Sequence, residues 1–186
     1  MQPDFSRIHA DLREYAPRYP EEAESVVQFI DFLSSDAAVF MRSHLQGHFT
    51  GSAWLVSADG NNVLLMHHRK LDRWLQPGGH ADGDVDLTRV ALREAQEETG
   101  VADLRVEEGI FDIDRHRIPA RVNEPEHWHY DVRYVVRAGE DDRFVINEES
   151  NALAWRSVAE VAHDASFDGS LRRMARKWLA RDTASV

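Results

Sequence analysis

A group of carboxylates near the middle of the chain has the composition of a metal site. The segment "REAQEETG", residues 93–100, brings Glu94, Glu97 and Glu98 together just before Gly100. At the end of a helix this placement is unfavourable, because the helix dipole puts a partial negative charge there. Carboxylate oxygens are ligands for hard divalent cations such as Mg²⁺, Mn²⁺ and Ca²⁺, and Mg²⁺ usually brings substrate phosphates with it. The three glutamates therefore predict a divalent cation that is bound together with a phosphorylated substrate.

We expect a helix over residues 86–99 to present these glutamates. On a helical wheel with about 100° per residue, the apolar residues cluster around the direction of Glu94; they are Leu87, Val90, Ala91 and Val101. Glu97 and Glu98 fall at about −60° and about +40° on this wheel, within the stripe that should pack against the protein. Like charges on a packed face are costly, which favours a bound cation over a solvated acidic helix end. Arg93 can orient a carboxylate through an i,i+4 pair with Glu97.

Residues 47–165 resemble the Nudix hydrolase family. The family signature is Gly, five residues, Glu, seven residues, and then Arg-Glu-U-x-Glu-Glu-x-Gly-U, where U is a bulky apolar residue. Gly79 opens this motif, and "REAQEETGV", residues 93–101, closes it at the right spacing. The preceding "WLQPGGH" is similar to the strand that leads into the loop of the family. The sequence departs from the signature at Val85, which occupies the position of the first glutamate.

The resemblance implies a mixed β-sheet between helices and an enzyme that hydrolyses the diphosphate bond of a nucleoside diphosphate linked to another moiety. It also implies Mg²⁺ or Mn²⁺ as the cofactor. By position it assigns the metal ligands to the Gly79 carbonyl, Glu94, Glu97 and Glu98, with one of the three glutamates acting as the base instead of as a ligand. Arg93 would orient these carboxylates and so belongs to the same catalytic group. The later "NEESNALAWRSVAEV" resembles the stretch that carries one more functional glutamate, which makes Glu148 and Glu149 candidates for a further metal ligand or base.

The departure at Val85 leaves a second function open. A regulatory module with the same fold could bind a nucleotide without cleaving it and would tolerate this loss. Asp84 and Asp86 flank Val85, so either could replace the missing carboxylate, although Asp86 could equally serve only as the N-cap of the helix. A diphosphate isomerase of the isopentenyl type also has a "W…PGGH" segment. That family relies on a catalytic cysteine, and this chain contains none.

Four further polar residues are candidates for substrate binding, namely Arg69, His80, His127 and His129. Arg69 lies in "HHRKLDR", a basic segment of an acidic chain, and arginine can bind a phosphate through two hydrogen bonds. A solvated loop is the alternative for this segment. In "HWHYD", alternation would place His127, His129 and Asp131 on one face of a strand. Two histidines at this spacing also allow a zinc site, but we favour the lining of a substrate pocket.

The elements expected around the central helix indicate an α/β (α+β) fold. Short apolar runs and alternating segments predict strands at residues 49–58, 61–68, 104–113, 128–137 and 151–158. Helices are expected across residues 4–45, including a short one at 36–45, and at 170–180. We assign residues 1–46 to an N-terminal helical extension and residues 47–186 to a Nudix hydrolase domain.

The composition of the chain constrains its partners and its location. Its 186 residues carry a formal net charge of −11, which disfavours non-specific binding to nucleic acid or to an anionic membrane. The absence of cysteine excludes disulfides and thiol nucleophiles. We see no apolar region of a secretory signal and no run approaching the roughly 20 apolar residues that span a bilayer. We therefore expect a cytoplasmic protein that acts on a small-molecule nucleoside diphosphate derivative, with a homodimer as one option for its assembly.

Overall fold

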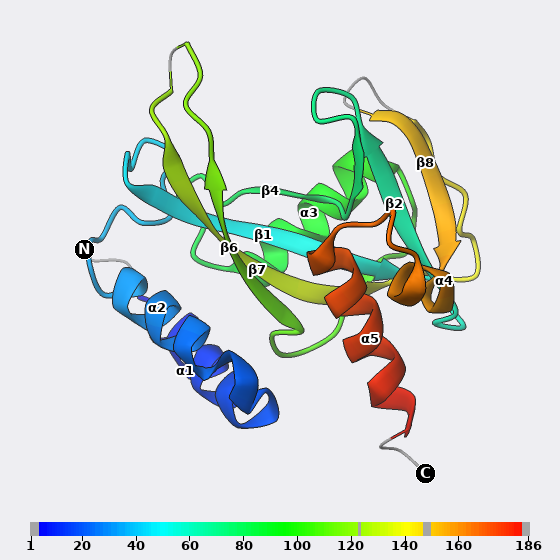
Figure 1. Cartoon of the computed structure of the whole chain (residues 1–186), viewed down its shortest axis with the longest axis horizontal. Coiled ribbons are helices and arrows are strands. Elements are labelled where there is room, and N and C mark those ends of the chain that lie inside the picture. Colours follow the sequence, from blue (N-terminus) through cyan, green and yellow to red (C-terminus); the bar gives the residue numbers. More distant parts are fainter. Residues whose placement is uncertain (1–3, 123, 147–149, 184–186) are drawn as a thin grey trace. The chain divides into compact units, whose positions relative to one another are not determined.

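The computed structural model describes residues 4–122, 124–146 and 150–183 (Figure 1). In this part of the chain the helical segments are α1 (Ser6–Tyr15), the 3₁₀ turns η1 (Ala16–Arg18) and η2 (Pro20–Glu22), α2 (Ala23–Leu33), α3 (Leu87–Thr99), α4 (Val158–His163) and α5 (Gly169–Thr183). The strands are β1 (Gly47–Val56), β2 (Asn62–His68), β3 (Arg73–Leu75), β4 (Gly78–His80), β5 (Arg105–Val106), β6 (Asp112–Ile118), β7 (His127–Arg137) and β8 (Ser150–Ser157). They form an eight-stranded sheet with the order β3-β2-β1-β7-β5, in which β4 pairs with β1, β6 with β7, and β8 with β2. The expected α+β class is confirmed.

Two compact units make up the chain, and each is built from segments that are distant in the sequence. The first unit comprises Met1–Ser52, Gly78–Ala91 and Glu108–Tyr134, and the second comprises Ala53–Pro77, Leu92–Glu107 and Val135–Val186. The elements β1, α3 and β7 each contribute residues to both units. The assignment of residues 1–46 and 47–186 to separate parts stays a prediction. Among the described residues, no helix has the length and apolar character needed to cross a membrane.

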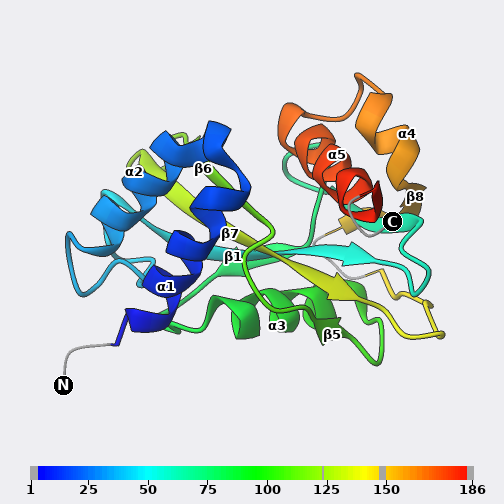
Figure 2. The same ribbon diagram turned by 90° about the horizontal axis from the view of Figure 1, so that it is seen from below.

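Aromatic side chains fill the core of the first unit. Phe32 of α2 stacks on Tyr130 of β7 with ring centroids 3.8 Å apart, and Phe29 contacts the same tyrosine edge-on at 5.3 Å. Phe40 stacks on Phe49 of β1 at 4.8 Å. Fully burying an aromatic or aliphatic side chain contributes about 1.5–3 kcal/mol. The N-terminal helices, which lie side by side in Figure 2, are therefore anchored to the strands of this unit.

The core of the second unit joins apolar strand residues to the end of α3. Its buried members are Ala53, Leu55, Leu64, Met66, Ala95, Val101, Leu104, Val136, Ala138 and Leu153. The strands β2 and β8 pair in antiparallel register from Asn62 opposite Ser157 to His68 opposite Ser150. The helices α4 and α5 pack together (Figure 2), and Trp178 of α5 donates its indole N–H to the Gly60 carbonyl at 2.8 Å. These contacts confirm the strands predicted at 61–68 and 151–158 and the closing helix.

The short helix predicted at residues 36–45 is not observed, and these residues form turns. The carboxylate of Asp36 accepts the backbone N–H of Ala38 at 2.7 Å. The Val39 carbonyl accepts the N–H of Phe49 at 2.8 Å. Local side-chain acceptors such as Asp36 compete with helical hydrogen bonds. The Val39 carbonyl, which a helix would use for its own hydrogen bonds, is instead bonded to β1. The segment therefore serves as a connection that is tied to β1.

The strand predicted at residues 104–113 is also corrected, because the structure divides it into β5 and the first part of β6. Gly109 lies between them with φ of +80°. Glycine adopts this left-handed conformation readily, but a strand cannot continue through it. The strand predicted at residues 128–137 is confirmed as β7, and the helix predicted at 86–99 is confirmed as α3.

Candidate active site

The start of α3 is held by the two aspartates that flank Val85. Asp86 occupies the N-cap position, where its Oδ1 accepts the backbone N–H of Arg89 at 3.3 Å. Asp84 accepts two hydrogen bonds from the Arg89 guanidinium, from Nε at 2.7 Å and from Nη2 at 2.5 Å. Arg7 of α1 lies 3.4 Å from the second oxygen of Asp86. Both carboxylates therefore have partners that fix the beginning of the helix.

The strand β4 holds Gly79 beside the central strand β1. Gly79 pairs in register with Gly51, and Gly78 pairs with Ser52. A Cβ on Gly78 would lie 2.1 Å from the Ser52 hydroxyl, so only glycine fits there without a clash. A Cβ on Gly51 would lie 3.0 Å from the Leu87 carbonyl. The paired glycines thus allow β4 and the start of α3 to approach β1 closely.

The end of α3 presents its three glutamates in different environments. Glu98 is buried with 8% of its surface exposed, and the side chain of Glu94 is 16% exposed. Arg93 donates from Nη2 to Oε1 of Glu94 at 2.8 Å, so its guanidinium orients that carboxylate. Glu97 is exposed, and the expectation that all three carboxylates lie on the packed stripe was wrong for this residue. At about 60° from Glu94, Glu97 lies at the edge of the stripe, where its side chain reaches solvent.

The last turn of α3 is anchored by backbone contacts. Gly100 adopts φ of +66° and donates its N–H to the Gln96 carbonyl at 2.9 Å, which confirms it as the residue that ends the helix. The Thr99 carbonyl accepts the N–H of Val145 at 2.7 Å. These hydrogen bonds satisfy carbonyls at the end of the helix and fix the turn that carries Glu98.

A polar network crosses β6, β7 and β1 within the first unit. The side chain of Arg133 is 3% exposed and donates to Asp131 at 2.7 Å and to Asp112 at 3.0 Å. The other oxygen of Asp131 accepts hydroxyl hydrogen bonds from Thr50 and Ser52, each at 2.8 Å. Sequence analysis did not find this network, because its contacts depend on which strands are neighbours in the sheet.

The same face of the sheet brings four histidines together. His80, His127 and His129 were expected near a substrate, and His48 of β1 joins them. The ring centroid of His48 lies 4.9 Å from that of His80 and 4.8 Å from that of His129. Sequence analysis missed His48. The sequence carried no signal for it, because the register that places Thr50 opposite His80, and so His48 on the same face, is seen only in the structure.

Three other candidates stay predictions. Arg69 is exposed and follows β2 directly. Glu148 and Glu149 lie outside the described residues, so the contacts of the structure do not test a role as metal ligand or base. The roles assigned to Gly79 and to the glutamates of α3 also rest on their sequence positions and their surroundings.

Comparison with known proteins points to one domain family. The family model described as "NUDIX domain" matches residues 48–178. A protein of Mycobacterium tuberculosis (strain CDC 1551 / Oshkosh) named "Putative 8-oxo-dGTP diphosphatase 3" is 33% identical over 111 residues, which cover 56% of this chain and 48% of that protein. The match to this curated relative therefore spans about half of its length.

Solved structures with a similar fold include hydrolases from two organisms. A C. elegans Ap4A hydrolase in a binary complex has a TM-score of 0.57 and 17% identity, over 73% of this chain and 98% of that chain. A hydrolase of the NUDIX family from Clostridium perfringens has a TM-score of 0.56 and 22% identity, over 72% of this chain and 97% of that chain. At these identities the likeness shows the fold alone.

Proposed function

The chain belongs to the NUDIX family, and from that premise we propose that it hydrolyses the diphosphate bond of a nucleoside diphosphate linked to another moiety, with Mg²⁺ or Mn²⁺ as cofactor. The observation that carries the proposal is the pair of shielded carboxylates at the end of α3. Glu94 and Glu98 are four residues apart, so their Cβ atoms lie about 5–6 Å from each other on one face of the helix. Glu98 is buried and Glu94 is largely so.

The charges of this helix end fit a divalent cation. The side chains of Glu94, Glu97 and Glu98 carry three negative charges, and that of Arg93 carries one positive charge. These four side chains therefore sum to −2, at the end of a helix where the dipole already disfavours negative charge. Carboxylate oxygens are suitable donors for Mg²⁺ and Mn²⁺, so the donor set fits the cofactor of the proposal. The Gly79 carbonyl as a further ligand follows from the signature alone.

Each side chain has a distinct part in the proposed reaction. A bound metal would neutralise phosphate oxygens and lower the pKa of a water molecule. Glu98 and Glu94, which are shielded from solvent, hold the cation, and Arg93 keeps the Glu94 carboxylate in one orientation. Glu97 remains accessible to water, so it is the glutamate best placed to accept a proton from the attacking water.

Within this substrate class, the leaving moiety is left to experiment. ADP-ribose, nucleotide sugars, dinucleoside polyphosphates and noncanonical nucleoside triphosphates all contain the bond in question. The names of the relatives, which refer to 8-oxo-dGTP and to Ap4A, justify including both compounds. A screen of these substrates with Mg²⁺ and with Mn²⁺ identifies the preferred one.

Metal dependence and charge removal test the proposal together. Turnover of the best substrate should disappear in excess chelator and return when Mg²⁺ or Mn²⁺ is added. Glu97→Gln should reduce kcat by about 10²–10⁴-fold if this residue is the base, and Glu98→Gln should raise the metal concentration required. Glu160→Gln on the exposed surface of α4 is the matched control and should retain full activity. Full turnover in chelator would overturn the proposal.

A nucleotide-binding module without hydrolysis is the second candidate, and the surroundings of Val85 favour it. Asp84 is engaged by Arg89 and Asp86 caps α3, so neither carboxylate is spare to replace the missing glutamate. Calorimetric binding without release of a phosphate-bearing product, across the whole substrate screen, would support this candidate over the hydrolase.

A further inference from the structure

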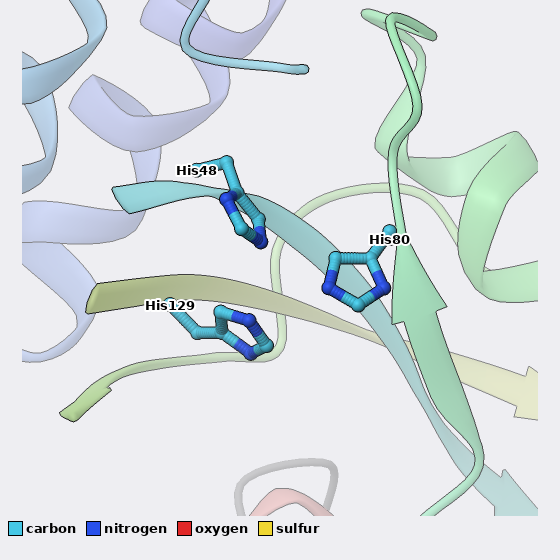
Figure 3. Close-up of side chains that lie close together, drawn as sticks. All are labelled: His48, His80 and His129. Atoms are coloured by element: carbon cyan, nitrogen blue, oxygen red, sulfur yellow. The ribbon is translucent and has the colours of Figure 1, made fainter. Parts of the chain in front are cut away.

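Three histidines on neighbouring strands direct their rings toward one another (Figure 3). They are His48 of β1, His80 of β4 and His129 of β7, and one ring nitrogen of each lies within 4.8 Å of the others. The sheet explains this arrangement, because β4 pairs with β1 and β1 is a neighbour of β7. All three side chains belong to the face that also carries Thr50, which is opposite His80 in the register.

The burial of His48 without hydrogen bonds is the strongest sign of a bound ligand in this group. Its residue surface is 1% exposed, and neither Nδ1 nor Nε2 has a hydrogen-bond partner within the described part of the chain. A buried polar group without a partner costs about 1–3 kcal/mol. A metal ion bound to one of these nitrogens would replace the lost hydration and would account for a histidine at this position.

Two of the three rings, those of His48 and His129, are neutral at pH 7. Burial, followed by the neighbouring rings of His80 and His127, lowers the pKa of His48 to about 4. Burial and then the neighbouring His48 and His116 lower the pKa of His129 to about 2. Neutral imidazole is the form that binds metals, whereas an anion such as phosphate would be attracted by the charged form. The neutral rings of His48 and His129 are therefore compatible with the metal site that the positions of the ring nitrogens indicate.

Charged side chains lie close to these histidines. Arg42 is paired with Asp82 at 2.5 Å, so its positive charge is largely neutralised there. Glu124 lies 3.7 Å from Nε2 of His127 and adds a negative charge that favours a cation.

His127 is positioned as a fourth ligand. Its Nδ1 donates to the Pro125 carbonyl at 2.9 Å, so Nε2 of the neutral ring carries a lone pair, which accepts from Nε2 of His129 when no metal is bound. That Nε2 lies 3.3 Å from Nε2 of His129. Nitrogens that bind one tetrahedral Zn²⁺ at about 2.0–2.1 Å are also about 3.3 Å apart. A backbone carbonyl that accepts the second N–H is the usual way to orient a metal-binding histidine.

We propose that His48, His80 and His129 bind one Zn²⁺ ion, with Nε2 of His127 in the fourth position. Nitrogen donors favour zinc and other late transition metals over Mg²⁺, so the site differs in metal preference from the carboxylates of α3. The nitrogens of the three rings lie within 4.8 Å of one another, so binding requires them to approach by up to about 1.5 Å to reach tetrahedral spacing. This inference does not depend on hydrolytic activity.

The full chain, stripped of metal and then freed of chelator, tests the site. Titration with Zn²⁺ against a competing indicator should give one ion per chain, and Co²⁺ should give the absorption bands of tetrahedral coordination. His80→Ala and His129→Ala should each weaken Zn²⁺ binding by more than about 100-fold, because even the loss of an outer partner costs about 10–100-fold. His163→Ala is the matched control, since His163 is exposed at the end of α4.

Thermal melting guards against misfolded variants and separates this proposal from the hydrolase proposal. Zn²⁺ should raise the Tm of the wild type, of His163→Ala and of Glu97→Gln, because a ligand of the native state stabilises it. It should leave the Tm of the correctly folded His80→Ala variant unchanged. Binding that persists in both histidine variants, or that is lost only in Glu97→Gln, would overturn the proposal, as would no Zn²⁺ binding by the wild type at millimolar concentration.

Discussion

Replacing Arg133 with methionine should destabilise the protein more than most single substitutions. The guanidinium is 3% exposed and lies between Asp131 and Asp112, which are themselves buried. Burial alone would lower the pKa of Arg133, but the charges of Asp131, Asp114 and Asp112 raise it above its ordinary value, so the side chain stays charged. Methionine has a similar length and no charge. The substitution therefore leaves two buried carboxylates without their cation.

The expected loss follows from the partners that remain. Removing one partner of a buried ion pair costs about 3–5 kcal/mol. Asp131 would keep its hydrogen bonds from Thr50 and Ser52, whereas Asp112 would lose a direct ion pair at 3.0 Å. We therefore expect a loss of about 4 kcal/mol in the free energy of unfolding. Because typical domains are stable by about 5–15 kcal/mol, the variant should be folded only marginally at 25 °C.

Urea denaturation at pH 7, followed by circular dichroism, measures this loss. Arg143→Met is the control, because that arginine is exposed and pairs with Asp141 at the surface, so its midpoint should not change. Combining Arg133→Met with Asp112→Leu should recover part of the stability, since a buried ion pair can be replaced by apolar groups at little cost. A midpoint of Arg133→Met close to that of the wild type would refute the electrostatic argument.

Four further substitutions, one of them with a matched control, test the elements that position the candidate site. Gly51→Val should lose about 1–3 kcal/mol of stability in urea denaturation because its side chain overlaps the start of α3, whereas Gly169→Ala, which meets no atom within 4 Å, should not. Gly100→Ala should lower the Tm, since an L-residue in the left-handed conformation costs about 1–2 kcal/mol; an unchanged Tm would contradict this. Val85→Glu should lower the metal concentration for half-maximal turnover by about 10–100-fold. Asp84→Asn should lower the Tm without changing that metal concentration. A higher metal requirement of Asp84→Asn at an unchanged Tm would show that Asp84 has taken over the role of the missing glutamate.

Much of the fold could be predicted because its elements are encoded locally. The strand β7 alternates along its length, and α3 has an apolar stripe that ends at a glycine. Each pattern can be recognised from neighbouring residues alone. The errors occurred where a distant partner decides the structure. The Val39 carbonyl is occupied by Phe49 of β1, and the kink at Gly109 separates two strands that each pair with β7.

The residues of the candidate site also differ in whether they could be predicted from neighbouring residues in the sequence. The carboxylates of α3 follow one another in the sequence, so their type and spacing could be recognised, but the exposure of Glu97 depends on what covers each side of the helix. The histidine cluster draws one residue each from β1 and β4 and two from β7.

No spacing rule connects His48 with His129, because only the order of the strands makes them neighbours. The pair His127 and His129 had suggested zinc too weakly to be preferred. Two imidazoles at alternate positions of one strand are weak evidence for a metal, and the stronger signal is the ring of His48, which comes from another strand and lacks a hydrogen-bond partner among the described residues. A metal site assembled across strands therefore has to be found in the structure, whereas one assembled along a helix can be found in the sequence.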